Sequence, residues 1–172
     1  FGNDPRPQDK LVYTDLSKDF PGYIYDKKTH KSTYMGESPS EGGYVYYEPG
    51  VYHNVVVFDI ASMHPHSAIA MNYFGPYAQR FKDLVDIRIC IKHGDLESAK
   101  KLFGGKLAPY LEDESSTKQL AAALKIFINS IYGYTAAKFD NPFKQKDNVD
   151  NIIAKRGALF MINLKHEVQK RG

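Results

Sequence analysis

The sequence has little cysteine and no long apolar run. Cys90 is the single thiol among 172 residues, so no disulfide can form within the chain, and this composition is typical of a reducing, intracellular compartment. No apolar stretch approaches the roughly 18 residues of a membrane span. Internal repeats and low-complexity tracts are lacking too. We therefore expect a cytoplasmic protein with no membrane partner, and neither a disulfide scaffold nor a repeat array.

The chain also lacks an initiator methionine and the charged-then-apolar layout of a signal peptide, since it begins at Phe1. We expect it to be an excised piece of a longer protein. Its 42% hydrophobic and 25% charged residues lie near the globular average and argue against disorder. A length of 172 residues predicts one domain with two small lobes at most.

Positive charge is scarce in the first half and concentrated in the second. Residues 1–75 hold 6 Lys and Arg against 9 Asp and Glu, whereas residues 76–172 hold 17 against 11. An acidic half followed by a basic half is compatible with binding to a polyanion, but a solvated surface gives the same balance.

Residues 1–75 favour strands and loops. The segments 22–25, 44–47 and 55–58 are rich in β-branched and aromatic residues and are bounded by Gly and Pro. The unbroken run 55–58 predicts a strand buried on both faces. We expect it to pair with 44–47 as a hairpin.

From Pro76 the apolar period becomes helical. The pattern predicts a helix that ends at Gly94, and then a short helix capped by Asp95 and ended by Gly104-Gly105. The capping-box form at Ser116 predicts the start of a long helix, and residues 140–143 a loop. A last helix is predicted over about 150–169. The fold class expected is α+β.

One candidate site is Asp59, at the end of the predicted buried strand. A carboxylate there suits Mg²⁺, which takes one or two protein carboxylates plus phosphate oxygens. An Asp that simply caps the following turn fits the same place. His64 and His66 nearby raise a third hypothesis, a metal-dependent hydrolase using them with Asp59, although no third ligand follows at a zinc-motif spacing.

Two further clusters lie on the predicted helices. Arg88 and Lys92, four residues apart and followed by His93, fit either a bridging anion or a screened surface. The other cluster combines four side-chain types on one helical face: a cation suited to phosphate, an amide, a phenol that can stack on a base, and a glycine that permits close approach. Its members are Lys125, Asn129, Tyr132 and Gly133.

Four strings resemble, in family order, elements of the family B (DNA polymerase alpha-like) DNA polymerases. The first is similar to the end of the YxGG element before the polymerase domain: Gly42-Gly43. The second is similar to motif A (DxxSLYP): Asp59-Ile60-Ala61-Ser62-Met63-His64-Pro65. The third and fourth are similar to the RxxxK element of one fingers helix and to motif B (KxxxNSxYG) of the other: Arg88-Ile89-Cys90-Ile91-Lys92 and Lys125-Ile126-Phe127-Ile128-Asn129-Ser130-Ile131-Tyr132-Gly133. The 66-residue separation of Asp59 and Lys125 resembles compact polymerases of bacteriophages and mobile elements, for which the compartment would be the host cytoplasm.

The resemblance implies a function and a role for each matching residue. The function is Mg²⁺-dependent, template-directed nucleotidyl transfer from a dNTP to a primer 3′-hydroxyl in DNA replication, with DNA primer-template and dNTP as partners. Asp59 and the carbonyl of Ile60 would hold catalytic Mg²⁺ in a two-metal site. The N–H groups of Ser62, Met63 and His64 would cradle the triphosphate. Its phosphates would be bound by Arg88, Lys92, Lys125 and Asn129, and Tyr132 with Gly133 would face the nascent base pair.

The implied architecture is part of a polymerase palm, with antiparallel β-strands and helices, plus an antiparallel helical fingers hairpin. Its parts are a palm segment with motif A over 1–75, fingers with motif B over 76–134, and a return to the palm with a C-terminal helix over 135–172. His64 and Ser40 each stand where the family usually has Tyr. No motif C, with its paired aspartates, precedes Gly172.

Because motif C is lacking, we expect the chain to be inactive alone and its two-metal site to be incomplete. The missing palm and thumb segments, and an exonuclease segment where there is one, would be its partners. Two alternatives remain open: a non-catalytic nucleotide- or DNA-binding module, and one half of a split polymerase completed by another chain.

Overall fold

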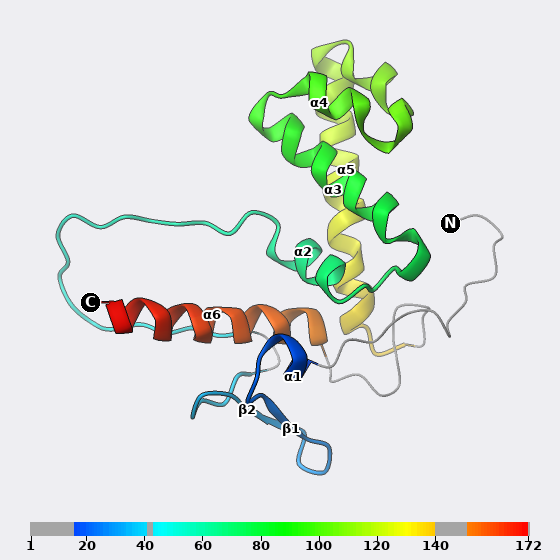
Figure 1. The fold of residues 1–172 in the computed structure, drawn as a ribbon. Coiled ribbons are helices and arrows are strands. Elements are labelled where there is room, and N and C mark those ends of the chain that lie inside the picture. Colours follow the sequence, from blue (N-terminus) through cyan, green and yellow to red (C-terminus); the bar gives the residue numbers. More distant parts are fainter. Residues whose placement is uncertain (1–15, 41–42, 140–150, 172) are drawn as a thin grey trace.

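The fold is α+β, as expected, with helices predominating (Figure 1). The computed structural model describes residues 16–40, 43–139 and 151–171. In chain order the elements are α1 (Leu16–Asp19), β1 (Ile24–Asp26), β2 (Lys31–Thr33), α2 (Met63–Ala70), the 3₁₀ turn η2 (Gly75–Tyr77), α3 (Ala78–His93), α4 (Leu96–Lys101), the 3₁₀ turns η3 (Leu102–Gly105) and η4 (Ala108–Leu111), α5 (Glu114–Ala136) and α6 (Ile152–Arg171).

The helices α3 and α5 lie side by side as a long hairpin, with α4 at its far end (Figure 1). Gly94 ends α3 as predicted: it adopts a left-handed φ of 77°, and its N–H bonds back to the carbonyls of Cys90 and Ile91. Asp95 then caps α4 by accepting a 3.1 Å hydrogen bond from the Ser98 N–H. These two signals turn the chain at the tip of the hairpin.

The long helix α5 does not begin at Ser116. Its N-cap is Asp113, whose carboxylate accepts a 2.8 Å hydrogen bond from the Ser116 N–H. Aspartate caps a helix as well as serine does, and here Asp113 has the extended backbone of an N-cap, whereas Ser116 already lies in the first turn. The predicted N-cap was therefore wrong by three residues, and Ser116 acts as the donor to the cap.

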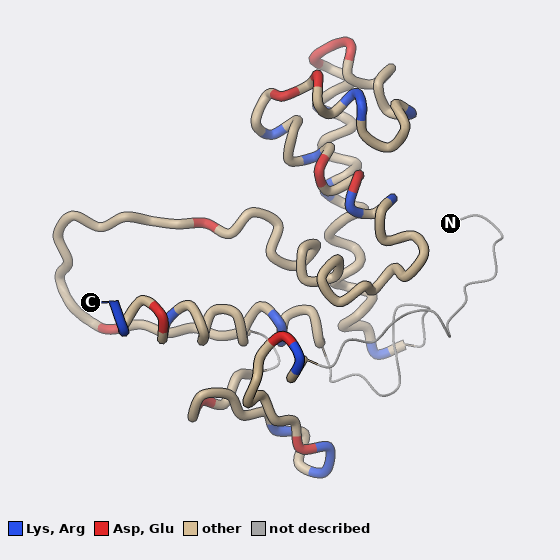
Figure 2. The backbone as a smooth tube through the Cα atoms, viewed as in Figure 1, with Lys and Arg blue, Asp and Glu red and all other residues tan. Residues whose placement is uncertain are grey.

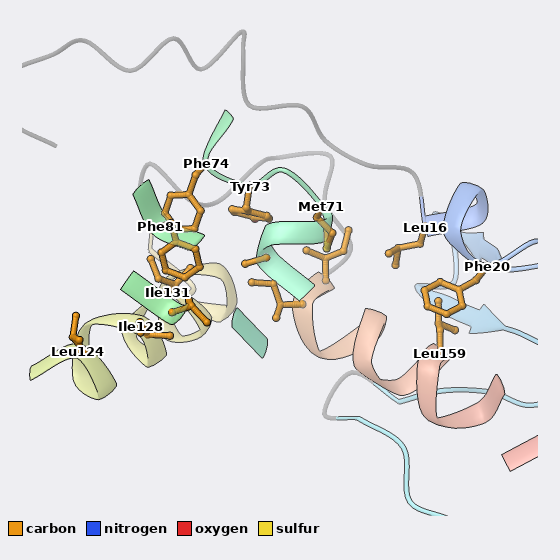
Figure 3. Close-up of a cluster of buried hydrophobic side chains, with 14 of the residues drawn as sticks. Leu16, Phe20, Met71, Tyr73, Phe74, Phe81, Leu124, Ile128, Ile131 and Leu159 are labelled. Carbon is orange, nitrogen blue, oxygen red and sulfur yellow. The ribbon is translucent and has the colours of Figure 1, made fainter. Parts of the chain in front are cut away.

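A continuous apolar core joins the hairpin to the rest of the chain (Figure 3). The apolar stripe of α5 is buried at Leu124, Ile128 and Ile131, as its helical spacing predicts. Phe74 and Phe81 stack at the base of α3, with ring centroids 4.1 Å apart. Helix α2 packs against α3, α5 and α6, so it occupies the junction of the two parts.

Helix α6 contacts α1, where Arg156 pairs with Asp19 at 3.2 Å, and it confirms the last predicted helix. Its residues Ile153, Leu159 and Ile162 are fully buried. Strands β1 and β2 pair antiparallel, with Ile24 opposite Thr33, so only the end of the predicted 22–25 strand is formed. The buried Lys155 of α6 donates hydrogen bonds to the carbonyls of Pro39 (2.8 Å) and Ser40 (3.1 Å).

The hairpin predicted from 44–47 and 55–58 is absent, which corrects the sequence-based expectation. Among the described residues the only strand pair is β1 with β2, and residues 43–62 form an extended segment that runs along α6 and then loops back to α2 (Figure 1). Tyr44 and Tyr46 bond to Lys165 and Gln169, which draws the first arm onto α6 and away from the second. Without a partner strand, high β-propensity does not produce a strand.

As a result, the run 55–58 is exposed rather than buried. Its four apolar side chains are between 65 and 89% accessible. The whole segment 43–62 carries two acidic residues and no Lys or Arg, whereas the helices carry charges of both signs (Figure 2). No helix in the described ranges combines the length and apolarity that crossing a membrane requires.

Candidate functional site

A pocket of about 230 Å³ forms where the extended segment, α3 and α5 meet. Its lining comes from three places far apart in the sequence, and five of its eight residues are predicted site residues. The lining residues are Asp59, Ala61, Ser62, Arg88, Ile89, Lys92, His93 and Asn129. The fold therefore brings part of each of the three predicted clusters to one cavity.

The α3 wall of the pocket is basic. Arg88 and Lys92 lie one turn apart, and Ile89 and His93 form the neighbouring row of the same helix. Neither cation has an ion-pair partner among the described residues, whereas Lys82 on the same helix pairs with Asp86. Two unneutralised cations beside one cavity favour an anionic ligand.

The opposite wall contains the only acidic side chain that lines the pocket, Asp59. It is exposed and accepts no hydrogen bond within the described part of the chain, so its oxygens are accessible to a cation. An accessible carboxylate oxygen beside a cavity fits Mg²⁺, a hard cation. Ile60 follows Asp59 in the segment but does not line the pocket.

Ser62 turns the chain from the extended segment into α2. Its backbone is left-handed, with φ 54° and ψ 46°, and its carbonyl accepts the His66 N–H at 3.0 Å. Because the first N–H groups of a helix have no intrahelical acceptor, those of Met63 and His64 are available at this end. A helix start of this kind favours an anion, and Ser62 itself lines the pocket.

The α5 wall contributes Asn129 but not Lys125. Lys125 is exposed one turn earlier along α5, toward the tip of the hairpin, and does not line the pocket. Of the four residues expected to bind the phosphates, Arg88, Lys92 and Asn129 line this pocket and Lys125 does not. Gly133 lies beyond Asn129, with open space where a Cβ would stand.

The predicted base-pair residue Tyr132 stacks on His64. Their rings are 4.5 Å apart and inclined by 24°, and Asn151 donates a 3.0 Å hydrogen bond to the Tyr132 hydroxyl. Partial burial lowers the pKa of His64, which favours the neutral imidazole at pH 7. The stack joins the start of α2 to α5 beside the pocket.

Gly157 of α6 lets α2 approach closely at the same end. A Cβ placed on Gly157 would lie 2.7 Å from the Met63 Sδ, which is closer than real contacts allow. A larger residue here would displace the side chain of Met63, the first residue of α2. Nothing in the sequence pattern of α6 singles out this position.

Sequence reasoning named His93 beside Lys92 without giving it a role, and it missed a second, aromatic groove. His93 follows Lys92 at the helix end, and the i+4 spacing from Ile89 was the signal for its place on the pocket wall. The second groove, of about 490 Å³, lies between the extended segment and α6. It is lined by Tyr44, Tyr46, Tyr47, Glu48, Tyr52, Met161, Leu164, Lys165, Val168 and Gln169.

The YxGG-like region is only partly described. Gly42 lies outside the described residues. Gly43 has a φ of 124° and bridges Ser40, whose hydroxyl donates to the Gly43 carbonyl at 2.7 Å. Because the Ser40 carbonyl also accepts from Lys155, this turn is fastened to α6.

The hydrolase hypothesis finds no ligand cluster. Within the described ranges no three His, Cys, Asp or Glu side chains gather as a metal site would require, so His64, His66 and Asp59 do not form one. The ring of His64 instead packs on Tyr132.

Comparison of the chain with family models, with curated proteins and with solved structures finds no match in any of the three.

Proposed function

We propose that this chain is a palm-and-fingers part of a DNA-directed DNA polymerase of family B. One observation carries the proposal: Asp59 and Ser62 of the motif A string, Arg88 and Lys92 of the RxxxK string, and Asn129 of the motif B string line one pocket. Strings that matched by chance would have no reason to meet in space. The pocket supports the resemblance independently of the order of the motifs.

The chemistry of the lining residues suits the phosphates of a nucleoside triphosphate. Arg88 and Lys92 supply charge-assisted hydrogen bonds to phosphate oxygens, and the Asn129 amide adds a neutral donor. The N–H groups at the start of α2, next to the pocket-lining Ser62, would add donors for the same anion. Such groups act most strongly where charge develops as pyrophosphate leaves.

Asp59, assisted by the Ile60 carbonyl, would hold Mg²⁺. When bound, the metal would lower the pKa of the primer hydroxyl and neutralise phosphate charge. Asp59 is the only carboxylate on the pocket wall in the described part of the chain. Because two ions need more ligands than this, the chain supplies part of the catalytic site.

That single carboxylate also favours a second possibility, one half of a split polymerase. In that case a separate polypeptide would contribute the remaining carboxylates. A non-catalytic nucleotide- or DNA-binding module would use the same basic wall without needing them.

Primer extension by the complete protein tests the proposal. We expect Asp59→Asn to lower kcat by about a thousandfold or more, because several kcal/mol of transition-state stabilisation would be lost. The matched control is Asp83→Asn, which removes an acidic residue of α3 that does not line the pocket. Equal activity of wild type and Asp59→Asn would refute the proposal.

The isolated chain should extend no primer, for the same reason. Extension above the level of Asp59→Asn would show that one carboxylate is enough. If the isolated chain becomes active when a second polypeptide with paired aspartates is added, the split-enzyme possibility is favoured.

A further inference from the structure

We infer that His93 is a phosphate-binding residue of this pocket, acting with Arg88 and Lys92 on the polyphosphate of a nucleotide. The inference rests on the proposed function and extends it, because His93 lies outside all four family-like strings. It adds one phosphate contact, at the last turn of α3, to those implied for the residues of the four strings.

The geometry of α3 places His93 beside the two cations. Lys92 and His93 are adjacent in the last turn, and Arg88 lies one turn before Lys92; all three line the pocket. His93 also stands one turn after Ile89, which contributes the apolar part of the same wall. The three donors therefore form a short arc around one cavity.

Capping of α3 does not explain the imidazole. Two carbonyls of the last turn already accept backbone donors: Cys90 and Ile91 accept the Gly94 N–H, and Cys90 also accepts the Asp95 N–H at 2.9 Å. His93 has no hydrogen-bond or ion-pair partner among the described residues. The nearest acid in sequence, Asp95, is engaged with the Ser98 N–H. The imidazole is thus an unused donor at the pocket.

The size of the pocket indicates which part of a nucleotide it holds. At about 230 Å³ it is smaller than the roughly 300–1,000 Å³ of cavities that enclose a whole small molecule. Its polar groups are two cations, an imidazole, an amide and one carboxylate. A polyphosphate segment matches that volume and charge. The sugar and base would lie outside it, toward His64 and Tyr132.

Titration of the chain with inorganic tripolyphosphate in the presence of Mg²⁺, followed by calorimetry or NMR, tests the inference. We expect His93→Ala to weaken binding about three- to tenfold, as loss of one exposed charge-assisted contact should. His93→Arg should bind at least as tightly as wild type, because it restores a donor. The matched control His53→Ala removes an exposed histidine outside the pocket and should leave binding unchanged.

The variants separate the two levels of inference. If Arg88→Ala and Lys92→Ala weaken binding but His93→Ala does not, the role of His93 is overturned and the proposed function stands. Absence of binding by the wild type, or binding as tight as wild type by all three alanine variants, overturns the anion site and removes the main support for the proposed function. His93 would instead have a structural role if His93→Ala lowered the Tm and His93→Arg failed to restore the binding that His93→Ala loses.

Discussion

The helical hairpin and the extended segment 43–62 contribute opposite walls of one pocket but are built in opposite ways. The hairpin holds its side chains through a packed interface of α3 with α5, in which Phe81, Val85 and Ile87 are buried. The segment holds Asp59 on a backbone that pairs with no strand in the described residues, and every side chain from 51 to 60 is exposed.

The difference shows that the basic wall and the acidic wall of the pocket are preorganised to different degrees. Arg88, Lys92 and Asn129 are positioned by contacts within the chain. Asp59 is positioned only from its C-terminal side, by the left-handed turn at Ser62 and the packing of α2. The acidic wall therefore depends more on additional contacts than the basic wall does.

Two phenylalanines give the most direct test of this comparison. Phe81→Ala should lower the free energy of unfolding by about 3–5 kcal/mol, because it empties a fully packed position, whereas Phe58→Ala should change it by less than about 0.5 kcal/mol. The two side chains are 2% and 89% exposed. Urea unfolding measures both. Comparable losses would mean that the segment is packed in solution.

The anchor at the start of the segment predicts a smaller effect. Lys155, 3% exposed, bonds to two carbonyls, so Lys155→Ala leaves both without this donor and should cost about 2–3 kcal/mol of unfolding free energy. The control on the same helix is Lys170→Ala, which breaks an exposed pair with Glu167 worth less than about 0.5 kcal/mol. Thermal or urea denaturation compares them, and equal stabilities would discount the anchor.

Under the proposed function, the stack of His64 on Tyr132, which joins α2 to α5, predicts an effect on sugar selection by the complete polymerase. A neutral imidazole is flat but shorter than a phenol and can accept a hydrogen bond from a 2′-hydroxyl. His64→Tyr should therefore raise the dNTP-over-rNTP ratio of kcat/KM by about tenfold, and His64→Ala should lower it. Single-nucleotide incorporation measures the ratio. The same ratio in all three proteins would remove His64 from this role.

The smallest effect is expected at Glu37, which fastens the segment to α6. Burial alone would raise the pKa of Glu37, but hydrogen bonds from Lys165, Tyr44 and His166 outweigh it and hold the pKa below its ordinary value of 4.5. A depressed folded-state pKa contributes stability above pH 4.5 that is lost as the pH falls through the folded value.

Glu37→Gln should consequently cost about 1 kcal/mol at pH 7 and reduce the loss of stability between about pH 5 and pH 3. Unfolding curves across that range measure the difference. The matched control is Glu97→Gln, which removes a more exposed carboxylate paired on α4. A wild-type profile unchanged by Glu37→Gln would contradict the assignment of the pKa shift.

Local signals predicted the helical half of the site. The apolar period, Gly94 and Asp95 fix α3 and α4 through interactions within a few residues, and these features appear where expected. The i, i+4 spacing of Arg88 and Lys92 placed both on one wall. The start of α5 was misplaced because Asp113 and Ser116 are both competent caps and sequence alone does not rank them.

The β half could not be predicted in the same way. A strand at 55–58 needs hydrogen-bond partners distant in sequence, and β-propensity reports the fit to such partners rather than a property of the segment. His93 was named but given no role, because histidines at helix ends are usual. The closeness of Gly157 to Met63 depends on the packing of α6 on α2, which no local pattern encodes.

The exposure of residues 51–60 has a calorimetric consequence. An average globular chain gains about 12–15 cal/mol/K of heat capacity per residue on unfolding, because apolar groups become hydrated. The valines and Phe58 in this stretch are already hydrated in the folded chain, so they add almost nothing to that gain. These side chains can still lose their hydrating water if another molecule binds over them. Burying them in a complex would then give a negative heat-capacity change of binding, although they contribute almost nothing to the heat-capacity change of the chain's own unfolding.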